Sequence, residues 1–132
     1  MRDPRTPRRV AILGGAGGIG RALVAQLKAQ GDEVVVLDLA ASLERHVLDA
    51  KVIAINVCDE RSVTTAFTEL GQHWNSVDGF VNLAAYNSTL QPIGDMAADY
   101  FDEITGGNLR GAFLPAKAAL PLMAEAGSVV MI

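Results

Sequence analysis

Residues 13–20 read LGGAGGIG, so five glycines fall within eight positions. They follow the apolar run VAIL and precede RALVAQLKAQG, which places them where a strand should turn into a helix. Ordered glycine costs backbone entropy, so this density indicates that a large group approaches the backbone closely. A glycine-rich turn at the start of a helix presents backbone N–H groups at the positive end of the helix dipole. A pyrophosphate can bind there.

The glycines fit two overlapping patterns. Gly15, Gly17 and Gly20 match G-x-G-x-x-G. Gly14, Gly18 and Gly20 match G-x-x-x-G-x-G. Either match alone is a weak signal, and both predict the same phosphate-binding chemistry.

An acidic residue at the end of the next apolar run, EVVVLDL, supports this interpretation. Asp38 lies 18 residues after Gly20, at the expected carboxyl end of a strand. A carboxylate there can accept hydrogen bonds from both hydroxyls of an adenosine ribose. It would repel a 2′-phosphate, and neither the glycine turn nor Leu39 supplies a lysine or arginine to offset that repulsion. The sequence therefore predicts a dinucleotide ligand, with NAD preferred over NADP.

Apolar strand-like runs alternate with helical ones through most of the chain. The candidate strands are residues 9–14, 33–39, 51–57, 78–84 and 127–132. This alternation predicts a parallel sheet with crossover helices, and the nearly continuous apolar character of the runs suits strands covered on both faces. The predicted fold class is α/β. Residues 9–132 should form one dinucleotide-binding domain, and residues 1–8 a flexible basic tail.

Three helical segments are expected between these strands. Residues 19–30 carry apolar side chains at every fourth position, and Gly31 provides a stop. Asp59 is the expected N-cap of the next helix, whose buried stripe includes Trp74. Residues 97–123 should form a further helix with a kink or break, because the segment contains three glycines and two prolines.

Composition limits the partners and the compartment. The chain has 132 residues, enough for one domain, and residues 10–132 hold seven basic and fourteen acidic side chains. This balance argues against nucleic acid as a partner, and no apolar run is long enough to span a membrane. Cys58 is the only cysteine, which favours the cytoplasm and predicts a small buried side chain. His46 and His73 each stand alone, so no metal site is predicted.

Four stretches resemble, in order and spacing, the short-chain dehydrogenase/reductase family. They are GGAGGIG, INVCDERSV, VNLAAY and FDEITGGNLRGAFLPAKAALPLM. The resemblance covers residues 9–132 and selects the G-x-x-x-G-x-G pattern, with Leu13 where the family usually has threonine. It implies a Rossmann-like, doubly wound parallel sheet in three α/β/α layers. The implied strand order is 3-2-1-4-5, and the sheet would be incomplete at its C-terminal edge.

The resemblance also assigns roles to individual residues. Together with the glycine and aspartate arguments, it gives a cofactor-binding set of Gly14, Gly17, Gly18, Ile19, Gly20, Asp38, Leu39, Asn56, Val57, Asn82 and Ala84. Asn56 replaces an aspartate that contacts the adenine in the family, and an amide can still hydrogen-bond an adenine edge. Asn82 and Ala84 match the strand end that borders the nicotinamide ribose. The neighbouring Leu83 and Ala85 depart from the family pattern.

One catalytic position is also implied. Asn108 falls on the family's catalytic asparagine, whose usual role is to hold a water in a proton relay through its backbone, where the helix is kinked. Gly107 stands where the family usually has an aliphatic residue, which weakens the helix at the expected kink.

The family's reaction also uses a serine, a tyrosine and a lysine that have no counterpart at the matching positions of this sequence. The family's serine follows the strand that matches GSVVMI, and its Y-x-x-x-K pair lies further on, whereas this sequence stops at Ile132. Tyr86 and Tyr100 have no lysine four residues later. We therefore expect the dinucleotide-binding half of an NAD-dependent oxidoreductase acting on an alcohol or ketone, inactive by itself.

Two alternatives remain open. The chain could be a noncatalytic module that senses NAD or docks a partner, or a relic that binds nothing tightly. In either case the apolar edge at residues 127–132 should favour association, including formation of a homo-oligomer.

Overall fold

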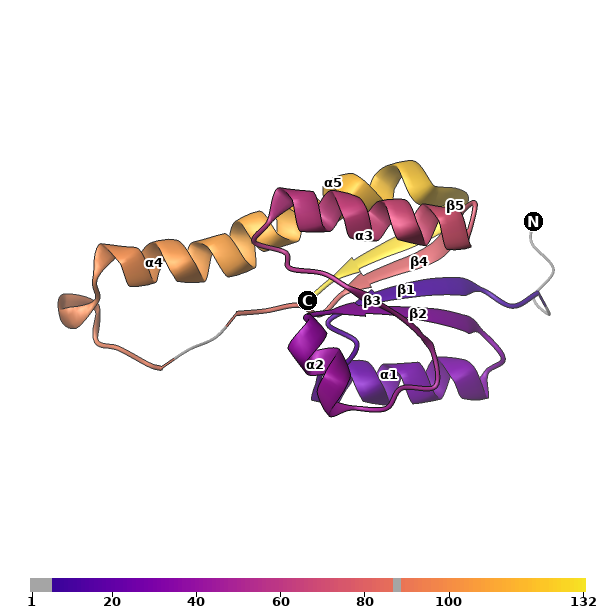
Figure 1. Ribbon diagram of the computed structural model, residues 1–132, viewed down its shortest axis with the longest axis horizontal. Helices are drawn as coiled ribbons and strands as arrows, with labels where there is room; N and C mark the ends of the chain where they lie inside the picture. The colour runs from indigo at the N-terminus through magenta and orange to yellow at the C-terminus, as the bar shows by residue number, and fades with distance from the viewer. Residues whose placement is uncertain (1–5, 87–88) are drawn as a thin grey trace.

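The computed structural model describes residues 6–86 and 89–132, and its centre is a five-stranded sheet. The strands lie in the order β3-β2-β1-β4-β5 (Figure 1). Their bounds are β1 Arg9–Leu13, β2 Glu33–Asp38, β3 Lys51–Ala54, β4 Val77–Asn82 and β5 Met123–Met131. Every neighbouring pair is parallel. The predicted fold class and strand order are therefore confirmed.

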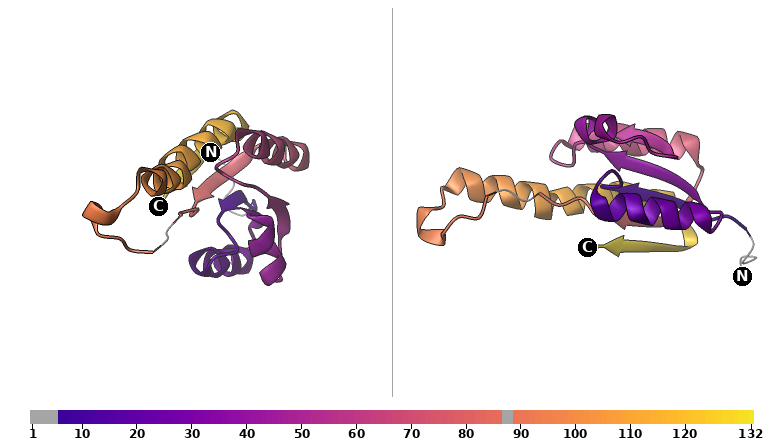
Figure 2. Two further views of the ribbon diagram at one scale, coloured as in Figure 1. Left: turned by 60° about the vertical axis from the view of Figure 1, so that its left-hand side comes forward. Right: turned by 90° about the horizontal axis from the view of Figure 1, so that it is seen from below.

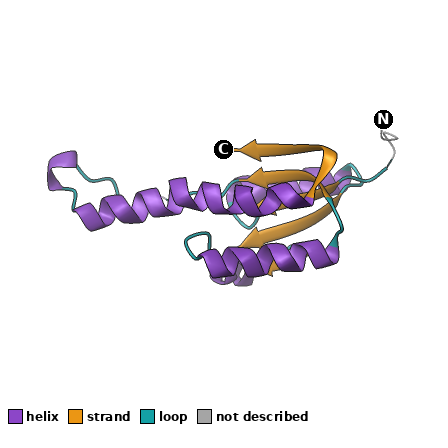
Figure 3. Ribbon diagram, turned by 90° about the horizontal axis from the view of Figure 1, so that it is seen from above, coloured by secondary structure: helices purple, strands orange, loops and turns teal. Residues whose placement is uncertain are grey.

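Helices cover both faces of the sheet, which gives three layers (Figures 1 and 2). α1 and α2 lie on one side, and α3 and α5 lie on the other. The helix bounds are α1 Gly18–Ala29, α2 Ala40–Arg45, α3 Glu60–His73, α4 Ala98–Thr105 and α5 Gly111–Ala119. Short 3-10 turns are η1 Ile93–Asp95 and η3 Leu120–Leu122. α4 projects well beyond the layered body (Figure 3).

Each face of the sheet buries its own apolar cluster. On the α1 face the cluster consists of Val10, Ile12, Val24, Val34 and Val36. On the opposite face, the ring of Phe80 meets Phe67 of α3 edge to face, with ring centroids 5.6 Å apart. Trp74 lies in this second cluster, buried as predicted, and its indole N–H donates to the Glu33 carboxylate at 3.2 Å.

β3 ends at Ala54, three residues earlier than expected. The side chain of Asn56 accepts the backbone N–H of Cys58 at 3.0 Å, and the Asn56 N–H donates to the Ser62 hydroxyl at 2.8 Å. These bonds turn the chain toward α3 and replace further pairing with β2. Asparagine favours such local turns, which is why the strand stops here.

The predicted N-cap of α3 is confirmed, because the Asp59 carboxylate accepts the N–H of Arg61 at 2.9 Å. α2, in contrast, is a helix that the sequence did not predict. It has six residues and buries none of them fully, so it lacks the apolar periodicity by which a helix is recognised.

α4 and α5 are joined by a π-helical segment, η2, from Gly106 to Arg110. The expected irregularity is therefore present, but as a widened turn within one continuous helical run. α5 contains Pro115, and Pro121 lies beyond its end, in η3. Single π turns of this kind are frequent at functional sites in helices.

β5 is longer than expected, since it begins at Met123 rather than at residue 127. Its regular pairing with β4 runs from Gly79 opposite Ser128 to Asn82 opposite Met131, and an irregularity precedes it. The additional residues belong to that irregular start. The apolar run GSVVMI therefore marked only the regularly paired part of the strand.

Arg8, at the end of the expected tail, is held against the turn between α1 and β2. Its backbone N–H and its Nε donate to the Asp32 carboxylate at 3.0 and 3.1 Å. The hydrogen bond with Asp32, and then its charge, raise the pKa of the Arg8 guanidinium above its ordinary value. Residues 1–5 lie outside the described residues, so flexibility of the tail stays a prediction.

Across residues 6–86 and 89–132, no helix combines the length and apolar character that crossing a membrane requires. The same residues contain no group of three or more His, Cys, Asp and Glu side chains placed to hold a metal ion.

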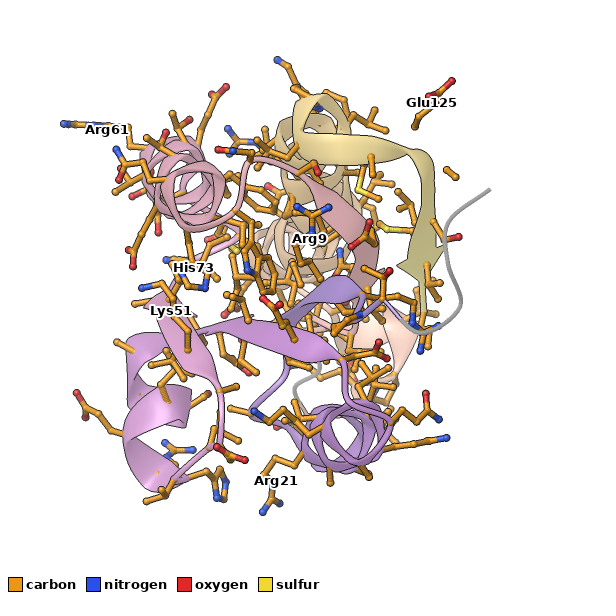
Figure 4. The ribbon with its side chains drawn as sticks, turned by 90° about the vertical axis from the view of Figure 1, so that its right-hand side faces the viewer. Arg9, Arg21, Lys51, Arg61, His73 and Glu125 are labelled. Carbon is orange, nitrogen blue, oxygen red and sulfur yellow. The ribbon has the colours of Figure 1, made fainter. Side chains whose placement is uncertain are left out.

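Seen along the strands, Arg21 and Arg61 point away from the body on its opposite sides (Figure 4).

Candidate functional site

The turn after β1 holds three elements together at Gly14. Its N–H donates to the Leu37 carbonyl of β2 at 2.8 Å, and its φ of +80° is one that glycine adopts without strain. A Cβ at this position would lie 2.8 Å from the backbone nitrogen of Ala84, at the end of β4. Gly14 is therefore required by the backbone conformation and by the approach of the β4 end.

Gly15 and Gly20 are required by packing. A Cβ on Gly20 would lie 2.5 Å from the carbonyl oxygen of Gly14 and 2.5 Å from the Cα of Gly15. A Cβ on Gly15 would lie 2.7 Å from a methyl carbon of Val36. The first turn of α1 can thus lie directly on the loop that precedes it only when these positions lack side chains.

Gly17 and Gly18 have a different reason to be small. A Cβ on Gly18 would meet no atom within 4 Å, and one on Gly17 would meet only the Gly14 carbonyl oxygen, at 3.4 Å. Gly17 is the N-cap of α1 and has no side chain to occupy the N–H groups that follow. The regular helical bonds begin with the Arg21 N–H, which donates to the Gly17 carbonyl at 2.9 Å. The start of α1 is therefore open to an anion.

Asp38 faces this loop from the carboxyl end of β2. One carboxylate oxygen accepts the Ala16 N–H at 2.9 Å, and the other accepts the Leu39 N–H at 2.8 Å. These two bonds fix the side chain beside the glycine turn. A carboxylate has about four acceptor positions, so capacity remains for the hydroxyls of a sugar.

A cleft of about 530 Å³ connects the glycine turn, Asp38 and the ends of β3 and β4. Seven predicted cofactor residues line it, namely Gly14, Gly17, Asp38, Leu39, Asn56, Val57 and Ala84. Gly18 and the exposed Ile19 lie at the start of α1, and Gly20 is buried behind the turn. A smaller hollow of about 400 Å³ lies between α3 and α5, away from the glycine turn.

Asn82 supports the cleft from behind. It is 2% exposed, and its side-chain oxygen accepts the Ala84 N–H at 2.9 Å. The amide therefore shapes the loop after β4, and Ala84, rather than Asn82, lines the cleft.

The side chain of Asn108 fastens the same loop to the π segment. It accepts the Tyr86 N–H at 2.9 Å and donates to the carbonyls of Tyr86 and Ile104 at 2.6 and 2.9 Å. The amide group of Asn108 is thus engaged with backbone, which holds Tyr86 in the lining of the cleft.

Eleven of the residues that line the cleft were not among the sequence-predicted set. They are Leu13, Ala16, Ser42, Arg45, His46, Ile55, Cys58, Leu83, Ala85, Tyr86 and Gly107. Cys58 is exposed, so its predicted burial is wrong. The turn made by Asn56 carries Cys58 past the end of β3 and out of the sheet. Its polar neighbours, Asp59 and Glu60, were the signal that could have indicated this.

Gly107 and Tyr86 provide a test of the loop packing. A Cβ on Gly107 would lie 2.5 Å from the Tyr86 Cβ, whereas one on Gly106 would meet nothing within 4 Å. We expect Gly107→Ala to lower the free energy of unfolding by about 1–3 kcal/mol because Tyr86 must move. Chemical denaturation measures this change, and Gly106→Ala is the matched control.

Tyr86→Gly should restore part of the loss in Gly107→Ala, because it removes the Cβ that causes the overlap. Tyr86→Ala retains that carbon and should not. Equal stability of the Gly106 and Gly107 variants would show that Tyr86 does not pack against the helix as described.

The family described as enoyl-(acyl carrier protein) reductase matches residues 14–132. A short chain dehydrogenase/reductase of Macrophomina phaseolina (strain MS6) is 33% identical, over 86% of this chain and 70% of the relative. The chain belongs to the short-chain dehydrogenase/reductase family. The family resemblance drawn from the four sequence stretches is therefore confirmed.

Further relatives of this short-chain dehydrogenase/reductase are longer. Levodione reductase of Leifsonia aquatica is 31% identical, over 96% of this chain and 51% of that protein. A crystal structure of levodione reductase superimposes with a TM-score of 0.81 at 32% identity, covering 94% of this chain and 53% of that one. The chain spans about half the length of the first curated relatives it matches.

Proposed function

We propose that this chain binds NAD in the cleft at the carboxyl ends of β1, β2 and β3, as the cytoplasmic, dinucleotide-binding half of an oxidoreductase that interconverts an alcohol and a ketone. The observation that carries the proposal is the open start of α1, where Gly18 has free space and the adjoining cleft contains Asp38. The positive N-terminal end of α1 and the Asp38 carboxylate, which can accept ribose hydroxyls, thus lie close together, as binding of a dinucleotide requires.

Each part of the cleft has a proposed contact. The backbone at Gly17, Gly18 and Ile19 would hold the pyrophosphate, with Gly14 and Gly20 shaping the turn. Asp38 and Leu39 would hold the adenosine ribose, and Asn56 and Val57 the adenine. Asn82 and Ala84 would form the border on the nicotinamide side.

NAD would supply the hydride-transfer chemistry when bound, and the residues described here would bind and orient it. Asn108 would hold a water through its backbone, since its side chain already fixes the π segment. The hydroxyls of Tyr86 and Tyr100 are engaged with Glu103 and with the Thr89 carbonyl. We therefore propose that neither tyrosine donates the reaction's proton and that the 132 residues alone are inactive.

Asp38→Ala tests the proposed site. Loss of charge-assisted hydrogen bonds to the ribose should weaken NAD binding by roughly 10- to 100-fold. Calorimetric titration with NAD and NADP measures the affinities, and thermal melting checks that the variant folds. Asp49→Ala is the control, because this carboxylate is almost fully exposed and its ion pair with Lys28 is long, at 3.7 Å. Unchanged NAD affinity in Asp38→Ala, or tighter binding of NADP than of NAD by the unaltered chain, would contradict the assignment.

The outer edge of β5 favours a second candidate function, the docking of a partner or of another copy. Among the described residues, β5 pairs with β4 alone, and Val129, Val130 and Met131 are each 41–44% exposed. Unpaired apolar edges promote association. Light scattering should show a defined oligomer if this candidate is correct, and a monomer that binds NAD would argue against it.

A further inference from the structure

Of the described residues that line the proposed dinucleotide cleft, Tyr86 alone is a phenylalanine, tyrosine or tryptophan. It lies two residues after Ala84, at the end of the cleft that we assign to the nicotinamide. The Tyr86 hydroxyl donates to a carboxylate oxygen of Glu103 on α4. The Asn108 amide holds the Tyr86 backbone at both its N–H and its carbonyl. Backbone and ring of Tyr86 are therefore both fixed beside the nicotinamide end.

Gly107 gives Tyr86 the room for this position. A Cβ on Gly107 would lie 2.5 Å from the Tyr86 Cβ and 3.1 Å from its Cγ. The family usually has an aliphatic residue at this place in the helix, and such a side chain would displace Tyr86. The position of Tyr86 thus depends on a residue at which this chain departs from the family pattern.

Glu103 brings a negative charge to the same end of the cleft. α4 reads ADYFDEIT, contains no basic residue and projects past the carboxyl ends of the strands (Figure 3). The ion pairs found across residues 6–86 and 89–132 do not include Glu103. Within the described part of the chain, no salt bridge therefore offsets this carboxylate.

The two redox forms of a nicotinamide differ in charge. The oxidised ring is a cation, whereas the reduced ring is neutral. A cation is attracted to the face of an aromatic ring and to a nearby carboxylate, and a neutral ring gains much less from either. A tyrosine bonded to a glutamate at the nicotinamide end should therefore distinguish two ligands that are otherwise nearly identical.

We infer that Tyr86 and Glu103 form a redox-selective wall, which binds oxidised NAD in preference to NADH. This inference rests on the proposed dinucleotide site. Glu103 acts through its charge and by positioning the Tyr86 ring, and neither residue exchanges a proton in this role. Tighter binding of the oxidised form lowers the reduction potential of the bound nucleotide, so bound NADH becomes a stronger hydride donor.

Glu103→Gln isolates the charge, because the amide oxygen can still accept the Tyr86 hydroxyl. We expect it to weaken binding of oxidised NAD by about three- to tenfold, and to change the affinities for NADH and ADP-ribose by less than about twofold. ADP-ribose lacks the nicotinamide and reports on the rest of the site. Calorimetric titration of the 132-residue chain with the three ligands measures the affinities, and thermal melting checks that the variant folds.

Tyr86→Leu removes the aromatic face and keeps an apolar side chain of moderate size. It should reduce the preference for oxidised NAD over NADH by about threefold. The affinity for ADP-ribose should stay as it is in the unaltered chain. A purely structural role of Tyr86 would instead lower all three affinities together.

Glu125→Gln is the matched control, since it makes the same substitution near the start of β5. Glu125 points away from the body at the amino ends of the strands (Figure 4). The variant removes one negative charge from the chain but none from the cleft. Its preference for oxidised NAD should equal that of the unaltered chain.

Three outcomes overturn the inference in distinguishable ways. If the unaltered chain binds NADH as tightly as oxidised NAD, the wall is not redox-selective, although the proposed function stands. If Glu103→Gln weakens all three ligands equally, Glu103 supports the fold or the adenosine end instead. If the folded, unaltered chain binds none of the three, the proposed function fails and this inference fails with it.

Discussion

Gly20→Ala is expected to lower the free energy of unfolding by about 3 kcal/mol, enough to leave little folded protein in a marginally stable domain. The new Cβ would lie 2.5 Å from the Gly14 carbonyl oxygen and from the Gly15 Cα. Both atoms belong to backbone that is fixed by its bonds to β2, so they cannot move aside as a flexible side chain could. Urea denaturation followed by circular dichroism measures the loss.

Gly18→Ala is the control for this experiment. It introduces the same methyl group two residues earlier in the same helix, where it meets no atom within 4 Å. We expect stability close to that of the unaltered chain, with weaker dinucleotide binding because the methyl group enters the space proposed for the pyrophosphate. Similar losses of stability in both variants would show that α1 does not begin against the loop in the described manner.

Phe80→Ala should destabilise the domain by about 3–5 kcal/mol. Phe80 has no exposed surface, and its ring packs edge to face on Phe67 between the sheet and α3. Truncation removes this contact and leaves a cavity that β4, paired on both sides, cannot collapse to fill. The midpoint of chemical denaturation is the measurement.

Phe113→Ala makes the identical substitution on the surface of α5. Phe113 is 59% exposed, and the Lys117 Nζ lies over its ring, 5.9 Å from the ring centroid. An exposed contact of this kind contributes about 0.5–1 kcal/mol, so the loss should be several times smaller than at Phe80. A loss at Phe113 as large as that at Phe80 would mean that the face of α5 is covered in solution.

The sequence alone was sufficient for the features that depend on neighbouring residues. Glycine density after an apolar run located the turn at Gly14, and the position of Asp59 before an apolar stripe located the start of α3. The alternation of apolar runs predicted the parallel sheet. Strand order came from the family resemblance, because the runs themselves carry no record of which strand pairs with which.

The site was predicted less completely, and its gaps have physical causes. α2 presents Arg45 to the cleft, but six residues with no buried side chain leave no periodic pattern to detect. Cys58 was expected inside because cysteine is usually buried, yet the hydrogen bonds of Asn56 turn the chain outward first.

The glycines show the same division between local and tertiary information. The two sequence patterns divide the five glycines by spacing alone, but the structure separates Gly14, Gly15 and Gly20, which the packing requires, from Gly17 and Gly18, where a Cβ would meet little or nothing. At Gly14 and Gly15 the restriction comes from Ala84 and Val36, residues far along the chain that the fold brings against the turn, whereas at Gly20 it comes from the backbone of the turn itself. The sequence by itself therefore determined the turns and helix starts, which depend on neighbouring residues. Long-range packing decided where each side chain lies relative to the cleft.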